Sequence, residues 1–127
     1  MVAFEVKSWS SVARATETLS RLASSFALED VTALGRFLAR NQHLLTLLEE
    51  AAAVIPPIFG FSLRPVVALE SDPDEPTDAS IVIWVPVSAE PERALKLMGE
   101  LDSTWWLDAS AQAQGQMCIS VDFDSGL

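Results

Sequence analysis

The spacing of apolar residues changes near residue 60, and this change constrains the fold of the 127-residue chain more than any other feature. Before residue 60, apolar side chains recur at intervals of three and four residues, which is the period of an amphipathic helix. After it, the stretches 61–70, 80–88 and 117–123 alternate with a period of two, which is typical of strands. The pattern predicts a single α+β domain, with a helical part at 1–58 and a strand-rich part at 61–127.

Three helices are predicted in the first part. The first covers about 9–26 and the second 29–40, each with apolar side chains on one face. The third begins after Asn41 and ends at Pro56 and Pro57, because proline has no backbone N–H and clashes with the preceding turn. A single longer helix with a kink near Asn41 is the alternative to separate second and third helices.

The strand-rich part is predicted to have ββαβ order. The acidic segment 71–78 joins the first two strands as a loop, and a helix beginning at Pro91 crosses over to the third strand. This crossover makes the second and third strands parallel. Because Pro86 lacks a donor and suits an edge, we expect the first strand to lie between the other two. Residues 2–7 also alternate and offer a fourth strand, so the mixed sheet is expected to have three or four strands.

Both faces of the predicted sheet carry apolar residues. One face is apolar throughout and is expected to pack on helices, whereas the other carries Val82, Trp84 and Pro86 among polar side chains. This second face is too apolar to lie wholly in water, so either the N-terminal helices or a second copy of the chain covers it. We favour self-association through this face or a helical face, and therefore expect a homodimer.

The charge is concentrated in the second half of the chain. Residues 65–127 hold twelve acidic and two basic residues and account for the whole net charge of −10. This asymmetry argues against binding to nucleic acid or to an anionic membrane and is compatible with a basic protein partner. The alternative interpretation is that the acidity simply keeps a rather apolar protein soluble. No uncharged run reaches the roughly 18 residues of a membrane span, and Glu5 and Lys7 interrupt any signal peptide, so we expect a cytoplasmic protein.

No catalytic constellation is recognisable. His43 is the only histidine, and no nucleophile motif accompanies it. Cys118 alternates with core residues of a predicted strand and is expected to be structural rather than reactive. The five glycines form no phosphate-binding loop. We therefore predict a non-enzymatic protein without a cofactor.

Metal binding is not predicted either. The acidic loop at 71–78 departs from the EF-hand pattern, because two prolines intervene and no glycine follows. Asp122 and Asp124 share a strand face and could join Asp102 or Asp108 around a magnesium ion, but their spacing is not specific for one. A solvated loop is the preferred interpretation of the acidic segment.

The adjacent Trp105 and Trp106 require separate explanations. On a helix that continues from Pro91, Trp105 follows Leu101 on the apolar stripe, whereas Trp106 lies on the flank with Asp102. Trp105 is therefore predicted to enter the core, and Trp106 either to pack under the loop at 110–115 or to anchor a partner. Alternatively, Asp102 ends one helix and caps another, which would reorient both rings.

These features favour a small acidic protein-interaction module. Its size, acidity and α+β order are similar to those of dimeric secretion chaperones and of immunity or antitoxin-like proteins, a similarity of composition that involves no motif. The alternative is a small-molecule or metal-binding domain, either a binding protein or an enzyme, with a pocket between helices and sheet near Trp84, Trp106 and Asp122. The partner-binding residues expected for the interaction module are Trp106, Asp102, Trp84, Asp72, Asp74 and Asp78.

Overall fold

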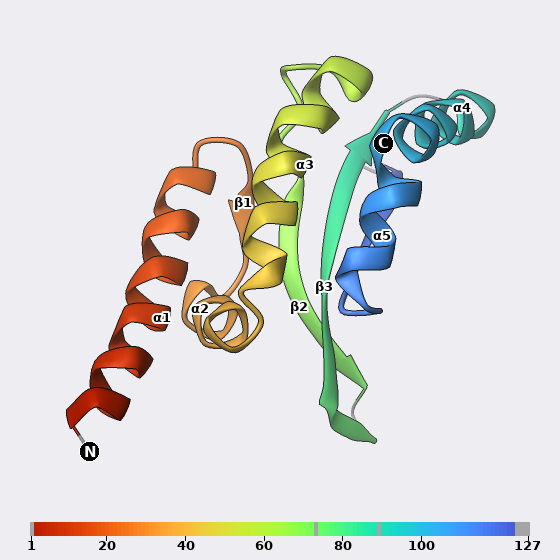
Figure 1. Cartoon of the computed structure of the whole chain (residues 1–127). Helices are drawn as coiled ribbons and strands as arrows, with labels where there is room; N and C mark the ends of the chain where they lie inside the picture. Colours follow the sequence, from red (N-terminus) through yellow and green to blue (C-terminus); the bar gives the residue numbers. More distant parts are fainter. Residues whose placement is uncertain (1, 73, 89, 124–127) are drawn as a thin grey trace.

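The computed structural model describes residues 2–72, 74–88 and 90–123, with side chains for 11–71, 74, 79–88 and 90–123 (Figure 1). It confirms an α+β architecture with a four-stranded mixed sheet. The strands are β1 (Ala27–Leu28), β2 (Val66–Asp72), β3 (Glu75–Val87) and β4 (Met117–Phe123). The helices are α1 (Val2–Leu22), α2 (Val31–Arg40), α3 (His43–Phe59), α4 (Pro91–Leu101), the π-helix η1 (Asp102–Trp106) and α5 (Leu107–Ala113).

The helical part differs from the prediction at its N-terminal end, whereas the second and third helices are separate as one of the two alternatives has them. Residues 2–7 belong to α1, so their proposed strand is wrong, and the fourth strand of the sheet is β1 instead. Helices α2 and α3 are separate, and the Asn41 side chain between them donates a hydrogen bond to the Phe37 carbonyl (2.9 Å). None of the helices in the described part of the chain has the length and apolar character needed to cross a membrane.

Helix α3 continues through Pro56 and Pro57, so the prediction that they end it is wrong. Both prolines lie in the last turn, so the two backbone donors that they lack are missing only from the end of the helix. The extra turn brings Ile58 and Phe59 against the core, and the Gly60 N–H then closes the helix on the Pro56 carbonyl (2.8 Å). Gly60 takes a φ of 124°, which is accessible to glycine and strained for other residues.

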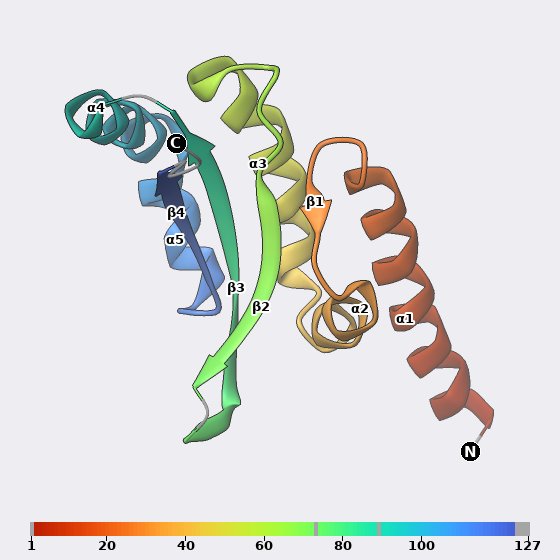
Figure 2. The same ribbon diagram turned by 180° about the vertical axis from the view of Figure 1, so that it is seen from behind.

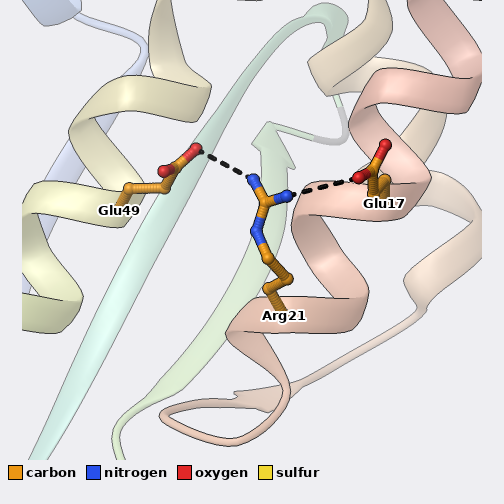
Figure 3. Close-up of polar contacts among 3 residues, drawn as sticks. All are labelled: Glu17, Arg21 and Glu49. Atoms are coloured by element: carbon orange, nitrogen blue, oxygen red, sulfur yellow. Dashed lines mark hydrogen bonds and ion pairs between the residues drawn. The ribbon is translucent and has the colours of Figure 1, made fainter.

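Helices α1 and α3 are also linked by Arg21, whose guanidinium lies 3.4 Å from the Glu17 carboxylate and 3.6 Å from that of Glu49 (Figure 3). All three side chains are exposed, so these ion pairs contribute little to stability. The apolar side chains beneath them, such as Leu19 and Leu48, are buried and account for the packing of the two helices in the core.

The sheet has the order β1-β2-β3-β4, with β3 antiparallel to β2 and parallel to β4. The predicted order, with the 61–70 strand in the centre, is therefore wrong, although β4 has the predicted bounds and the predicted parallel partner. Pro86 is tolerated in the central strand because it lies two residues beyond the last β2–β3 pair, Val66 with Trp84. At that point β3 has only β4 as a neighbour.

The acidic segment 71–78 is not a loop. Strands β2 and β3 continue into it and form a hairpin whose last pair is Asp72 with Glu75, after a register shift between Glu70 and Asp72. In both views the tip of this hairpin projects away from the helices (Figures 1 and 2). Alternation of polar and apolar residues is lost here, so the sequence pattern could not reveal the strands.

The main core lies between one face of the sheet and the helices. Ile81, Ile83 and Val85 of β3 point into it and have no solvent exposure. Helices α3 and α5 lie behind the sheet when it is seen from its other side (Figure 2). Helices α3 and α5 therefore cover one face of the sheet, and no helix of the described chain crosses the other face.

We predict that Ile83→Ala lowers the free energy of unfolding by about 2–5 kcal/mol, because it leaves a cavity in a fully buried site of the central strand. Thr46→Ala, at an exposed position of α3, is the control and should change stability by less than about 0.5 kcal/mol. Urea unfolding followed by circular dichroism measures both. A similar stability for the two variants would contradict the assignment of β3 as the centre of the core.

Candidate functional site

The face of the sheet opposite the helices is the candidate site, and we call it the open face. It carries Val82, Trp84 and Pro86, which alternate along β3 with the core residues. No helix of the described chain crosses this face (Figure 2), so the alternative in which the N-terminal helices cover it is wrong. The strand register brings these neighbours to the same face: Val66, Ala68 and Glu70 from β2, and Cys118, Ser120 and Asp122 from β4.

Trp84 is held across the open face by Glu70. The indole Nε1–H donates a hydrogen bond to the Glu70 carboxylate (3.0 Å). Along the β2–β3 ladder, the Ala68–Val82 pair lies between Trp84 and Glu70, so the ring has to lie over that pair to reach the carboxylate. Ala68 and Val82 are accordingly only 4% and 6% exposed, although they lie outside the main core. The open face thus has its own small apolar cluster, covered by an aromatic ring in a defined position.

Cys118 lies beside this cluster, opposite Val82 on β4. Its side chain is exposed on the open face. Cys118 alternates with core residues along β4, as expected, and therefore lies outside the core. Partial burial by the neighbouring side chains, and then the negative charge of Glu70, raise the pKa of the Cys118 thiol above its ordinary value. A raised pKa means that a smaller fraction of this thiol is ionised at a given pH than in an ordinary cysteine.

The two tryptophans of the pair lie on the opposite side of the sheet from Trp84. Both are half-buried and pack against the main core, with ring centroids 5.4 Å apart and ring planes at 43°. Trp105 also donates a hydrogen bond from Nε1 to the Glu50 carboxylate on α3 (2.7 Å). Both rings therefore face the core, which the α-helical spacing of adjacent residues did not predict.

The π-helix η1 makes this arrangement possible. The Leu107 N–H donates to the Asp102 carbonyl, five residues earlier, so the chain winds more widely than in an α-helix and successive side chains diverge less. Helices α4 and α5 are continuous through η1 but point in different directions (Figure 1). Asp102 itself has helical backbone angles (φ −61°, ψ −50°), so the proposed break with a second N-cap at this residue is wrong. Residues 110–113, which belong to the segment 110–115 expected as a loop over Trp106, are part of α5 instead.

The structure divides the predicted partner-binding residues among three places. Trp84 lies on the open face, and Asp74 is exposed in the turn of the hairpin. Trp106 and the half-buried Asp102 lie in η1 on the helical side. The backbones of Asp72 and Asp78 belong to the hairpin strands, but their side chains lie outside the described part of the chain.

A pocket near Trp84, Trp106 and Asp122 is not formed, because Trp106 packs on the other side of the sheet from the other two. Asp124 lies outside the described residues, and among those described no group of three His, Cys, Asp or Glu side chains could hold a metal ion. Pockets elsewhere on the described chain include two with defined linings. One of about 470 Å³ is lined by Ser24, Ser25, Ala52, Pro56, Phe61, Ser62, Leu63 and Arg64. The other, of about 200 Å³, is lined by Ile58, Phe59, Leu63, Pro86, Val87, Ser88, Arg93 and Leu97.

His43 takes part in an amide network rather than in a catalytic pair. Its Nε2 lies 2.9 Å from Oε1 of Gln116, whose Nε2 donates to the Asn41 side-chain oxygen (2.8 Å). These contacts tie the α2–α3 junction to the turn before β4. No hydroxyl or thiol is bonded to His43 among the described contacts, so this network offers no activated nucleophile.

In comparisons with known protein families, with curated proteins and with solved structures, the chain has no match. The candidate site therefore rests on geometry alone. Sequence reasoning identified Trp84 and the second sheet face, but it did not identify Glu70 as the partner of Trp84. The alternation of polar and apolar residues along the two strands was the only sequence feature that could have indicated this contact. It could predict the contact only if the register between the strands were known.

We predict that Glu70→Gln lowers the pKa of Cys118, because it removes a nearby negative charge and keeps an oxygen for Trp84. More thiolate will then be present at a given alkaline pH, and alkylation by iodoacetamide will become faster. Asp74→Asn, a charge loss at the hairpin turn, is the control. Equal alkylation rates against pH for Glu70→Gln and the unaltered protein would contradict the placement of Glu70.

Proposed function

We propose that the protein is a non-enzymatic interaction module that binds another protein through the open face of its sheet. The observation that carries this proposal is a sheet face that bears Trp84 and is covered by no helix of the described chain. Apolar faces of this kind mark interaction surfaces. Because the Glu70 bond already orients the ring, little conformational entropy is lost when a partner binds to it.

The acidic residues around this face favour a basic partner. Glu70 and Asp122 lie on the open face and are exposed, and Asp74 is exposed at the hairpin turn. The sequence places Asp72 and Asp78 in the same hairpin, within the half of the chain that carries the net charge. Such a charge distribution accelerates the encounter with a basic protein and weakens the complex as salt is added. We place this function among chaperone-, immunity- or antitoxin-like roles, in a cytoplasmic homodimer.

The first test is co-purification of the tagged protein from its own cells at low and moderate salt. We expect one stoichiometric basic protein that is lost as salt rises. Retention of the tagged protein alone would contradict the basic-partner proposal.

We predict that Trp84→Ala weakens binding of that partner by about tenfold or more, since buried tryptophans at interface centres dominate binding energy. Joint charge reversal of Asp72, Asp74 and Asp78 to lysine should slow association and reduce its salt dependence. Leu107→Ala is the matched control, because Leu107 is 68% exposed on α5, on the helical side. Binding is measured by calorimetry and by association kinetics, with circular dichroism to confirm folding. Unchanged affinity in both the Trp84 and the charge variants would exclude the open face.

A second candidate function is small-molecule binding in the pocket of about 470 Å³, whose volume lies within the usual range for ligand sites. A thermal-shift screen with metabolites and divalent metals tests it, because a ligand that binds only the folded protein raises the unfolding midpoint. Ser62→Trp, which would fill the pocket from its exposed rim, should abolish such a shift. A shift that survives this change would place the ligand elsewhere.

A further inference from the structure

The outer edge of β4 is an exposed pairing surface. β4 lies at the end of the strand order, and no strand of the described chain pairs with its outer side. The other edge of the sheet, β1, is only two residues long, whereas β4 has seven. Proteins usually protect long edges with lysine, proline or a bulge, but β4 has none of these and carries a single charge, at Asp122.

The pattern of hydrogen bonds determines which backbone groups of β4 face outward. The Ile81 N–H donates to the Gln116 carbonyl (2.8 Å), and Ile81 is in register with Met117. In a strand the N–H and C=O groups of one residue point to the same side and alternate from residue to residue. Residues 116, 118, 120 and 122 are therefore bonded to β3. The outward-facing groups belong to Met117, Ile119, Val121 and Phe123.

We propose that a second copy of this chain pairs with β4 along this edge, antiparallel to it, about a two-fold axis at Ser120. The inference rests on the proposed interaction function and identifies one of its partners. The two four-stranded sheets then form one continuous sheet of eight strands. A two-fold axis requires antiparallel strands, and the Ser120 register pairs all seven residues of β4.

The strand is complementary to itself in this register. The hydrogen-bonded pairs join Met117 to Phe123 and Ile119 to Val121 of the second copy, so apolar side chains meet on the helical side of the sheet. Phe123, which is 45% exposed in the single chain, gains an apolar neighbour.

The pairs on the open face are compatible with the charge of the chain. Ser120 meets Ser120, and Cys118 meets Asp122 of the second copy, so no two carboxylates oppose each other. The open faces of the two copies become continuous and present both Trp84 rings on one side. Because each copy carries a net charge of −10, added salt should strengthen self-association while it weakens binding to a basic partner.

Disulfide trapping tests the register. In the proposed pair, residue 120 and its copy form a non-hydrogen-bonded pair with Cα atoms about 4.5 Å apart, within the range of a disulfide. We expect Ser120→Cys, in a Cys118→Ser background, to form a cross-linked dimer on mild oxidation. Native Cys118 is an internal control, since its copy would lie about 14 Å away along the strands. Ser103→Cys, exposed in η1, is the second control. Trapping at position 120 no faster than at either control would overturn the register.

Proline substitution tests the edge itself. Val121→Pro removes an outward-facing N–H and no bond to β3, so the variant should fold and dimerise at least about tenfold more weakly. Val121→Ala, which also shortens the side chain but keeps the N–H, should remain dimeric. Sedimentation velocity over a range of protein and salt concentrations measures the association, and circular dichroism verifies the fold.

The outcomes separate this inference from the function on which it rests. A protein that is monomeric at all concentrations, or a dimer that Val121→Pro leaves intact, overturns the β4 pairing. Neither of these results bears on whether the open face binds the basic partner, which the Trp84→Ala variant tests separately. If partner binding survives both Trp84→Ala and Val121→Pro, while Val121→Pro disrupts the dimer, the β4 pairing is supported and the open face is rejected as the partner site.

Discussion

Burial of one face of β3 is the constraint on which the rest of the structure depends. Ile81, Ile83 and Val85 have no solvent exposure, so helices have to cover that side of the central strand. The antiparallel neighbour β2 is reached by a tight turn, but the parallel neighbour β4 requires a crossover. Residues 91–113 supply this crossover as α4, η1 and α5, which pack on the same face as α3.

The crossover has to change direction to stay on the sheet, and η1 is where it does so (Figure 1). A π-helical turn bends the segment without breaking it, and it directs both Trp105 and Trp106 towards the core. The bond from Trp105 to Glu50 fastens this bend to α3. The most distinctive sequence motif of the chain is therefore explained first by architecture. Among the tryptophans whose side chains the structure describes, this leaves Trp84 as the one best placed for recognition.

The open face of the sheet is the surface on which the proposed function depends. There the hydrogen bond between Trp84 and Glu70 covers Ala68 and Val82, so the face is ordered without a helix above it. Its apolar centre and its acidic surroundings fit a protein partner, and the bare edge of β4 beside it fits a second copy of the chain. Both proposals follow from the same cause, since no helix of the described chain crosses this face (Figure 2).

The sequence by itself determined the local properties of the chain: the change from helix to strand near residue 60, the bounds of β4, its parallel partner and the second apolar face. These follow from periodicity and from the short connections between neighbours. Only the tertiary structure decided the strand order, the addition of β1, the passage of α3 through Pro56 and Pro57, and the meeting of Trp84 with Glu70. The physical reason is that alternation tells which residues share a face, whereas strand neighbours and register depend on packing between residues far apart in the chain.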